Sequence, residues 1–216
     1  MARQKVSQVR KEFCRHTSIF AYLIMIAIIK YNAGNITSVY NAVKRLGYAC
    51  KVTDDKEEIR HAEKVIFPGV GEAGSAMIYL KERGLDRVIQ SLLQPTLGVC
   101  LGLQLMCSHS EEGDTPCLGI FDAGVKKFPS TDIVPHMGWN NLRDMQSPLF
   151  TGFGKEHTVY FVHSYYAEIC GQTIATSDYI LPFSAAIQKD NFYATQFHPE
   201  KSGSVGEQIL KNFLEL

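Results

Sequence analysis

The chain has 216 residues, of which 45% are hydrophobic, and its 22 basic and 22 acidic side chains cancel. This length supports one domain with a substantial core and is too short for two large ones. After the first fifteen residues the basic side chains are scattered along the sequence. The composition therefore argues against a surface that binds nucleic acid or another polyanion.

The N-terminal segment imitates a secretory signal, because five basic residues precede an apolar run over 19–29. However, no small-residue cleavage site follows, and the run is too short to span a membrane. Its second half, 25–31, has the pattern of a first β-strand. We therefore expect the folded domain to cover 25–216. Residues 1–24 are predicted to be a disordered extension, or the product of an upstream start-site error, that function does not need.

Six cysteines lie far apart, without the paired spacing of a zinc site or the density of a small secreted scaffold. This usage is typical of a reducing, cytoplasmic environment, in which most cysteines are small buried hydrophobes. The sequence predicts no metal site and no cofactor.

Apolar segments alternate with amphipathic ones in the first half of the chain. This alternation predicts an α/β fold with a mostly parallel sheet covered by helices. The expected strands are 25–31, 49–53, 64–67 and 96–99, and the expected helices are 36–46, 75–83 and 86–93. The second half predicts short strands over 124–128, 158–163, 173–176, 184–188 and 193–197, the last two forming a hairpin, and a closing helix over 205–216.

The segment Gly98-Val99-Cys100-Leu101-Gly102 lies where the fourth strand turns into a helix, which matches a nucleophile elbow. Glycines suit so sharp a turn because side chains there would clash with neighbouring backbone. Cys100 would stand at a helix N-terminus, where amide groups favour thiolate over thiol. The sequence therefore predicts Cys100 as a nucleophile, with the backbone N–H of Leu101 facing an oxyanion.

A second oxyanion donor is expected in the glycine-rich turn 68–71 after the third strand, although such a turn by itself is more often simple turn geometry. A thiolate that attacks an amide also needs a histidine to protonate the leaving amine and a group to orient it. His198 and Glu200, separated by one proline after the last strand, supply both. Among the other histidines, His163 is expected to be a hydrogen-bonded core residue.

Two motifs together carry a family resemblance: Gly-Val-Cys-Leu-Gly-Leu-Gln at 98–104 and Gln-Phe-His-Pro-Glu-Lys-Ser at 196–202. The pair resembles a class I glutamine amidotransferase. Three further stretches, 68–74, 134–140 and 160–166, are similar to the glutaminase subunits of imidazole glycerol phosphate synthases. The resemblance implies a flavodoxin-like sandwich with antiparallel strands in its C-terminal half. Its first strand departs from the family's usual Asp-Tyr-Gly, because Lys30-Tyr31-Asn32 stands there.

The resemblance also implies an activity and its residues. Glutamine would be hydrolysed to glutamate and ammonia through a glutamyl thioester. Ammonia would pass to a barrel-shaped cyclase subunit, in a heterodimer that makes imidazole glycerol phosphate and aminoimidazole carboxamide ribotide for histidine biosynthesis. The implied residues are the triad Cys100, His198 and Glu200, the oxyanion donors Val70 and Leu101, the glutamine-binding residues Gly71, Gln104, Ser164 and Tyr165, and the partner-facing residues Met137, Trp139, Tyr160 and Lys201.

Several alternatives stay open at the level of sequence. The chain could serve another ammonia-channelling synthase, although the stretches at 137–140 and 161–165 argue against that. It could be a non-catalytic redox or chaperone-like protein with a cysteine elbow, which intact His198 and Glu200 disfavour. It could also be a free-standing cysteine hydrolase that acts on glutamyl peptides. Trp139, finally, could be a core residue instead of an interface anchor.

Overall fold

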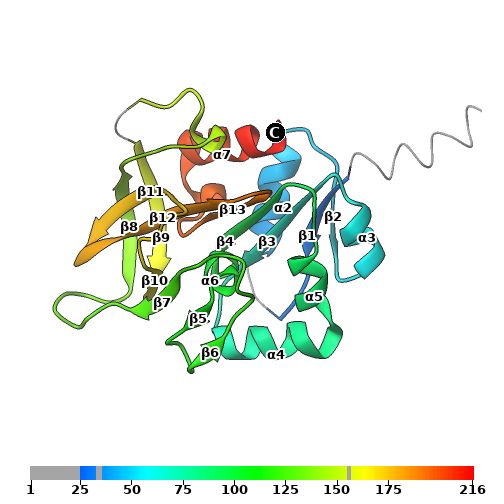
Figure 1. The fold of residues 1–216 in the computed structure, drawn as a ribbon. Coiled ribbons are helices and arrows are strands. Elements are labelled where there is room, and N and C mark those ends of the chain that lie inside the picture. The colour runs from blue at the N-terminus through cyan, green and yellow to red at the C-terminus, as the bar shows by residue number, and fades with distance from the viewer. Residues whose placement is uncertain (1–24, 33–35, 155–156) are drawn as a thin grey trace, which may run out of the picture.

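The computed structural model describes residues 25–32, 36–154 and 157–216. A twisted sheet of seven strands forms its centre, in the order β11-β12-β13-β4-β3-β1-β2 (Figure 1). Five of these strands run parallel: β1 (Ile26–Ile29), β2 (Cys50–Thr53), β3 (Lys64–Gly69), β4 (Thr96–Cys100) and β13 (Phe192–Thr195). The predicted neighbouring of the third and fourth strands is confirmed, with Gly69 opposite Cys100.

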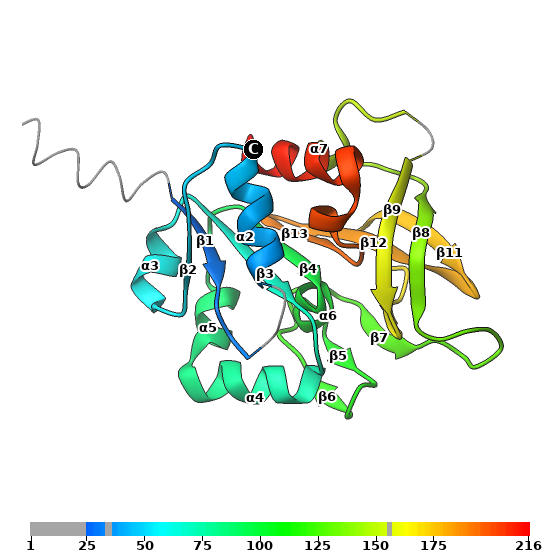
Figure 2. The same ribbon diagram turned by 180° about the vertical axis from the view of Figure 1, so that it is seen from behind.

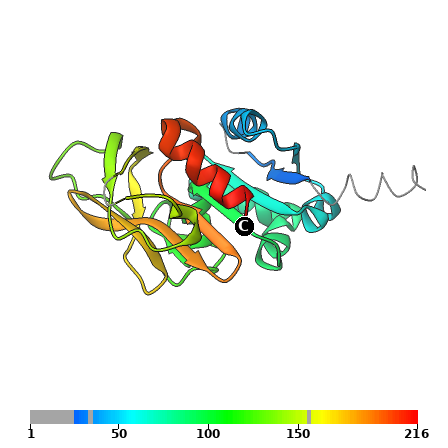
Figure 3. The ribbon, with the colours of Figure 1, turned by 90° about the horizontal axis from the view of Figure 1, so that it is seen from above.

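Helices cover both faces of this sheet, as Figure 3 shows from above. On one face lie α2 (Ile36–Arg45) and α7 (Gly203–Leu214), whose buried side chains join one apolar cluster with alternate residues of the strands. The other face is covered by α3 (Lys56–His61), α4 (Ala73–Arg83), α5 (Leu85–Gln90) and α6 (Leu101–Met106). Strands buried on both faces are apolar throughout, which is why β1 and β3 lack an alternating pattern.

The C-terminal half adds antiparallel pairs at one edge. The strands β11 (Thr173–Tyr179) and β12 (Leu181–Lys189) extend the main sheet, and the predicted hairpin is confirmed as β12 paired with β13. A small sheet contains β5 (His109–Ser110), β6 (Thr115–Pro116), β7 (Gly124–Lys127) and β10 (Tyr165–Ala167). A separate ribbon pairs β8 (His136–Leu142) with β9 (His157–His163), and it stands beside β11 and β12 (Figure 2).

The expected α/β class is therefore correct, and several element boundaries differ. The helix α3 and the strands β5, β6, β8 and β10 were not expected from sequence, and β11 and β12 are longer than predicted. The strand β8 escapes pattern reading because its exposed positions carry Met137 and Trp139 while its first buried side chain is His136. The expectation for 1–24 lies outside the described residues. Within them, no helix is long and apolar enough to cross a membrane.

Two single-turn 3-10 helices complete the fold: η1 (Pro148–Phe150) and η2 (Pro199–Lys201). The second follows β13 and packs against the first turns of α7. Gly206 makes this contact possible, because a β-carbon there would collide with the carbonyl group of Pro199. The absence of a side chain at Gly206 thus sets the position of the turn that carries His198 and Glu200.

Replacing Gly206 with alanine should lower the free energy of unfolding by about 1 to 3 kcal/mol, the usual cost of overpacking a closed contact. The matched control is Gly171→Ala, because a β-carbon at Gly171 meets no atom within 4 Å. Urea denaturation of both variants measures the difference. Equal stability of the two variants would contradict a tight contact between α7 and η2.

Candidate functional site

Cys100 ends β4 and caps the N-terminus of α6, in the position expected of an elbow. Its backbone lies at φ 55°, ψ −106°, a conformation that residues other than glycine rarely adopt and that the surrounding structure must enforce. The enforcement comes from close contacts: a β-carbon at Gly98 would press on the backbone of Gly102, and one at Gly102 would collide with the carbonyl oxygen of Phe67. Cys100 is thereby held at the floor of a pocket, with 6% of its surface exposed.

His198 and Glu200 lie together beside this cysteine. The Nδ1 atom of His198 is 2.8 Å from Oε1 of Glu200, and both side chains are 1% exposed. A carboxylate accepts, so Nδ1–H donates, which leaves Nε2 as the ring nitrogen available to the sulfur. Nε2 is buried, and it has no hydrogen-bond partner of normal geometry among the described residues.

The charges of this cluster favour an ion pair. Burial by itself would lower the pKa of His198, but the negative charge of Cys100 and hydrogen bonding to Cys100 and Glu200 outweigh burial. Together they raise the pKa of His198 from 6.5 to about 10. At neutral pH His198 is therefore protonated, as the proton-donating partner of a cysteine nucleophile must be.

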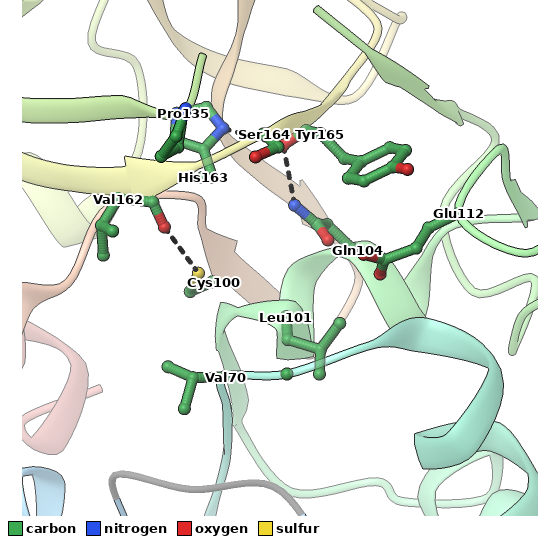
Figure 4. Close-up of a pocket in the computed structure, with 11 residues that line it drawn as sticks. Val70, Cys100, Leu101, Gln104, Glu112, Pro135, Val162, His163, Ser164 and Tyr165 are labelled. Carbon is green, nitrogen blue, oxygen red and sulfur yellow. Dashed lines mark hydrogen bonds between the residues drawn. The ribbon is translucent and has the colours of Figure 1, made fainter.

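A pocket of about 320 Å³ opens above the sulfur (Figure 4). It brings together seven of the residues predicted from sequence: Val70, Gly71, Cys100, Leu101, Gln104, Ser164 and Tyr165. Four further residues line it: Glu112, Pro135, Val162 and His163. Its volume suits one amino-acid-sized ligand, and Val70 and Leu101 flank the cysteine on the side of β3 and α6.

Gly69, in the turn that leads to Val70, is a glycine for a steric reason. A β-carbon there would collide with the hydroxyl of Tyr31 and press on the side chain of Leu101. Gly71 instead adopts φ +132°, which disfavours any other residue. Tyr31 lies at the end of the first strand and matches the tyrosine of the family's Asp-Tyr-Gly, so the residue next to this turn is shared with the family, and the departures are its neighbours Lys30 and Asn32.

Gln104 is fixed by two hydrogen bonds from its Nε2 atom. One goes to the backbone carbonyl of Tyr165 at 2.8 Å, and the other to Oε1 of Gln196 at 3.1 Å. A carbonyl can only accept, so the amide atom of Gln104 that faces Tyr165 is the donor Nε2. Oε1 of Gln104 therefore remains free to accept from a ligand. Gln196 was not singled out as a separate functional residue, although it begins the motif that contains His198.

Glu112 is a charged pocket residue that sequence reasoning missed. Its Oε2 atom accepts a hydrogen bond from the backbone N–H of Ala73 at 2.8 Å, which points the carboxylate at the pocket. Burial and the neighbouring Glu72 raise the pKa of Glu112, although the Ala73 hydrogen bond opposes the shift. No motif marks this position, and only the fold brings it to the glutamine-sized space.

A directional chain of hydrogen bonds runs behind the pocket. Nδ1 of His163 is 2.8 Å from the carbonyl oxygen of Tyr165, so Nδ1–H donates and Nε2 must accept. Nδ1 of His136 lies 3.1 Å from Nε2 of His163 and therefore donates to it. Nε2 of His136 in turn accepts a hydrogen bond from the side-chain amide of Asn140 at 3.3 Å. The expected role of His163 as a hydrogen-bonded core residue is confirmed.

The four residues expected to face a partner form one surface patch. Met137 and Trp139 are 63% and 57% exposed, which excludes a core position for Trp139 in this chain. The rings of Trp139 and Tyr160 meet edge-on with centroids 6.0 Å apart, and Nζ of Lys201 lies 6.0 Å from the ring centre of Tyr160. Among the described residues no cluster of side chains could hold a metal ion.

A parallel sheet that carries a strained cysteine at a strand-to-helix turn, beside a buried histidine–carboxylate pair, defines an α/β protein with a nucleophile elbow. The chain belongs to the class-I glutamine amidotransferase family, whose model matches residues 27–216. This confirms the resemblance drawn from the two motifs.

Individual relatives are more specific. The chain is 61% identical over 194 residues to imidazole glycerol phosphate synthase subunit HisH of Bacteroides fragilis, covering 88% of this chain and 99% of the relative. It is 47% identical to the subunit of the same name from Pasteurella multocida, covering 88% and 97%. Among solved structures, PurLQS from Thermotoga maritima superposes with a TM-score of 0.66 at 15% identity, covering 88% and 97%, which supports the fold alone.

The two neutral histidines predict how stability depends on pH. Burial lowers the pKa of His136 to about 4, and burial is also the first cause that lowers the pKa of His163 to about 3. In the unfolded chain both rings bind protons below about 6.5. The contribution of these two histidines to stability is therefore complete above that pH and falls as the pH drops toward 4, by at most roughly 1.4 kcal/mol per histidine and pH unit.

Urea denaturation near pH 7 and near pH 5 measures this loss in wild type and in His136→Gln, because histidine side chains titrate over about that range. Glutamine keeps a donor for Nε2 of His163 but does not titrate, so the variant should lose less stability on acidification than wild type. His61→Gln at an exposed position is the control and should behave as wild type. The same acid loss in wild type and His136→Gln would contradict a neutral, buried pair.

Proposed function

We propose that the chain is the glutaminase subunit of an imidazole glycerol phosphate synthase. It hydrolyses glutamine and delivers ammonia to a cyclase subunit for histidine biosynthesis. The relatives that are 46–61% identical over most of the chain carry that subunit name. The observation that carries the mechanism is that Cys100 lies at the floor of a pocket lined by polar groups that suit an amino acid, next to the buried pair of His198 and Glu200.

In the first half of the reaction, the thiolate of Cys100 attacks the side-chain carbonyl carbon of glutamine. The backbone N–H groups of Val70 and Leu101 stabilise the negative oxygen of the tetrahedral intermediate. His198 then gives its proton to the nitrogen as the carbon–nitrogen bond breaks, so that ammonia leaves and a glutamyl thioester remains. Glu200 holds the ring so that Nε2 faces the reaction.

In the second half, neutral His198 takes a proton from water, and the resulting hydroxide attacks the thioester carbonyl. Collapse of this second intermediate breaks the carbon–sulfur bond and restores the thiolate beside a protonated imidazole. The product leaves as glutamate once its new carboxyl group has lost its proton to the solvent. Atoms and charge are then as they were at the start. No metal or redox cofactor takes part in these steps, since acid–base and nucleophilic groups suffice.

The amino-acid end of glutamine carries an ammonium and a carboxylate, and the pocket offers groups for both. Glu112 and Oε1 of Gln104 accept hydrogen bonds and suit the ammonium group. The hydroxyl of Ser164 and the backbone N–H groups of Tyr165 and Gly71 are donors and suit the carboxylate. An ammonium beside Glu112 would also offset the burial that raises the pKa of that carboxyl group.

The exposed patch of Met137, Trp139, Tyr160 and Lys201 fits the docking of the cyclase subunit, because an exposed tryptophan and methionine are typical interface anchors. The complex is a heterodimer in the cytoplasm, where free thiols persist. The intact histidine–carboxylate pair disfavours a non-catalytic redox protein, and the unburied apolar patch disfavours a hydrolase that acts without a partner.

Glutamate release from glutamine should be low for the chain alone and should rise when the cyclase and its nucleotide substrate are added. Cys100→Ala should reduce the rate of the full mixture by roughly a thousandfold or more, as loss of a nucleophile does. The control Cys117→Ser, which removes a thiol outside the pocket, should leave the rate of the full mixture unchanged. Glutamate release by the chain without any partner would identify a free-standing hydrolase instead.

Replacing Glu112 with glutamine keeps an acceptor for the N–H of Ala73 but removes the charge that faces the ammonium group. We expect KM for glutamine to rise by about tenfold or more with a smaller change in kcat, since a charged hydrogen bond to the substrate is lost in ground and transition states alike. Steady-state kinetics of the complex measure both constants. Glu111→Gln, at the exposed neighbouring position, is the control; an unchanged KM in Glu112→Gln would exclude this role.

A further inference from the structure

The side chain of Gln196 is fully buried, with 0% exposed, in the segment between β13 and His198. Its Nε2 atom lies 3.8 Å from Sγ of Cys100, within the range of an N–H hydrogen bond to sulfur. Burying an amide is costly unless its polar atoms are satisfied, so this contact needs a physical account.

The orientation of this amide follows from its neighbours. The backbone carbonyl of Tyr165 can only accept, so the atom of Gln104 that lies 2.8 Å from it is the nitrogen. That same nitrogen lies 3.1 Å from the amide of Gln196, so the atom of Gln196 that it faces is the oxygen. The NH₂ group of Gln196 is then left on the side of the sulfur. Through Gln104, the backbone carbonyl of Tyr165 thus determines that the NH₂ end of the Gln196 side chain faces Cys100.

We propose that Gln196 is a further catalytic residue, whose amide donates a hydrogen bond to the thiolate of Cys100, and that Gln104 is a positioning residue that holds this amide in its donating orientation. The inference rests on the proposed function only in taking Cys100 as the nucleophile. It assigns Gln104 a second task besides contact with glutamine, through its nitrogen instead of its oxygen.

The chemistry explains why a neutral donor is useful here. His198 loses its proton to ammonia in the first half of the reaction and regains one from water in the second. Its positive charge is therefore intermittent. The amide of Gln196 does not titrate, so it remains a donor when the thiolate attacks and when the carbon–sulfur bond breaks and negative charge returns to sulfur. The carbonyl oxygen of Val162, 4.0 Å from Sγ, can accept from a thiol but cannot stabilise a thiolate.

Alkylation by iodoacetamide tests the contact without any turnover of glutamine, because the thiolate is the reacting form. The full chain is treated across neutral pH, and modification of Cys100 is measured by peptide mass spectrometry. Gln196→Met keeps the length of the side chain and removes the donor. It should slow alkylation of Cys100 by roughly tenfold near neutral pH, corresponding to the loss of about one hydrogen bond to a charged group.

Gln196→Glu should slow alkylation further where its carboxyl group is ionised, because a carboxylate oxygen, which can only accept, then replaces the donor facing sulfur. Gln90→Met removes an amide that bonds only the backbone carbonyl of Leu118 and serves as the matched control; it should alkylate as wild type. Cys107 is an internal reference in every sample, since burial raises its pKa well above the usual value and keeps it unreactive. Wild-type rates for folded Gln196→Met would overturn the proposal.

A second measurement needs no variant and decides the matter if the replacements fail to fold. In wild type, the side-chain amide protons of Gln196 should titrate in NMR spectra with the same midpoint as the ultraviolet absorbance of the thiolate. Amide signals that stay constant through that transition would overturn the proposal. If these tests support the contact but glutamate never appears with any partner, the proposed glutaminase function fails while the thiolate contact stands.

Discussion

The close approach of α6 to the sheet is the constraint on which the rest of the site depends. Gly98 and Gly102 allow the helix to start directly at the end of β4, because any side chain there would meet backbone of the facing segment. The turn forces Cys100 into a conformation that a free chain would avoid. The same close packing places Leu101 beside the sulfur and brings Gln104, one turn further on, to the wall of the pocket.

The strand β9 links the exposed patch to His198, the proposed proton donor. The backbone N–H of His198 donates to the carbonyl of Tyr160 at 3.0 Å, and the N–H of Tyr160 donates to the hydroxyl of Ser202 at 2.9 Å. That hydroxyl in turn donates to the carbonyl of His198 at 2.6 Å. A partner that contacts the ring of Tyr160 would therefore press on the strand that holds His198, and β9 continues directly to the pocket residues 162–165.

Sequence patterns were most informative where one local signal sufficed. Cys100 lies in a glycine-flanked turn, and His198 and Glu200 are separated by a single proline, so these three could be proposed as a triad from the sequence. Glu112 and Gln196 could not be assigned roles in the same way. Glu112 sits in a polar connection without a motif. The significance of Gln196 depends on a network of hydrogen bonds between residues that are 61 to 96 positions apart in the sequence. The ribbon strand β8 was missed because its exposed side chains are apolar.

The sequence by itself determined the α/β class, the family and the chemical groups of the triad, because alternating apolar segments and short motifs are local properties of the chain. The tertiary structure decided which groups are charged, which amide end faces the sulfur, and which tautomer each buried histidine adopts. Those choices depend on burial and on directional hydrogen bonds among segments distant in sequence, such as the carbonyl of Tyr165, which accepts from both His163 and Gln104. A pattern of residue types contains no information on direction, and a folded network of donors and acceptors does.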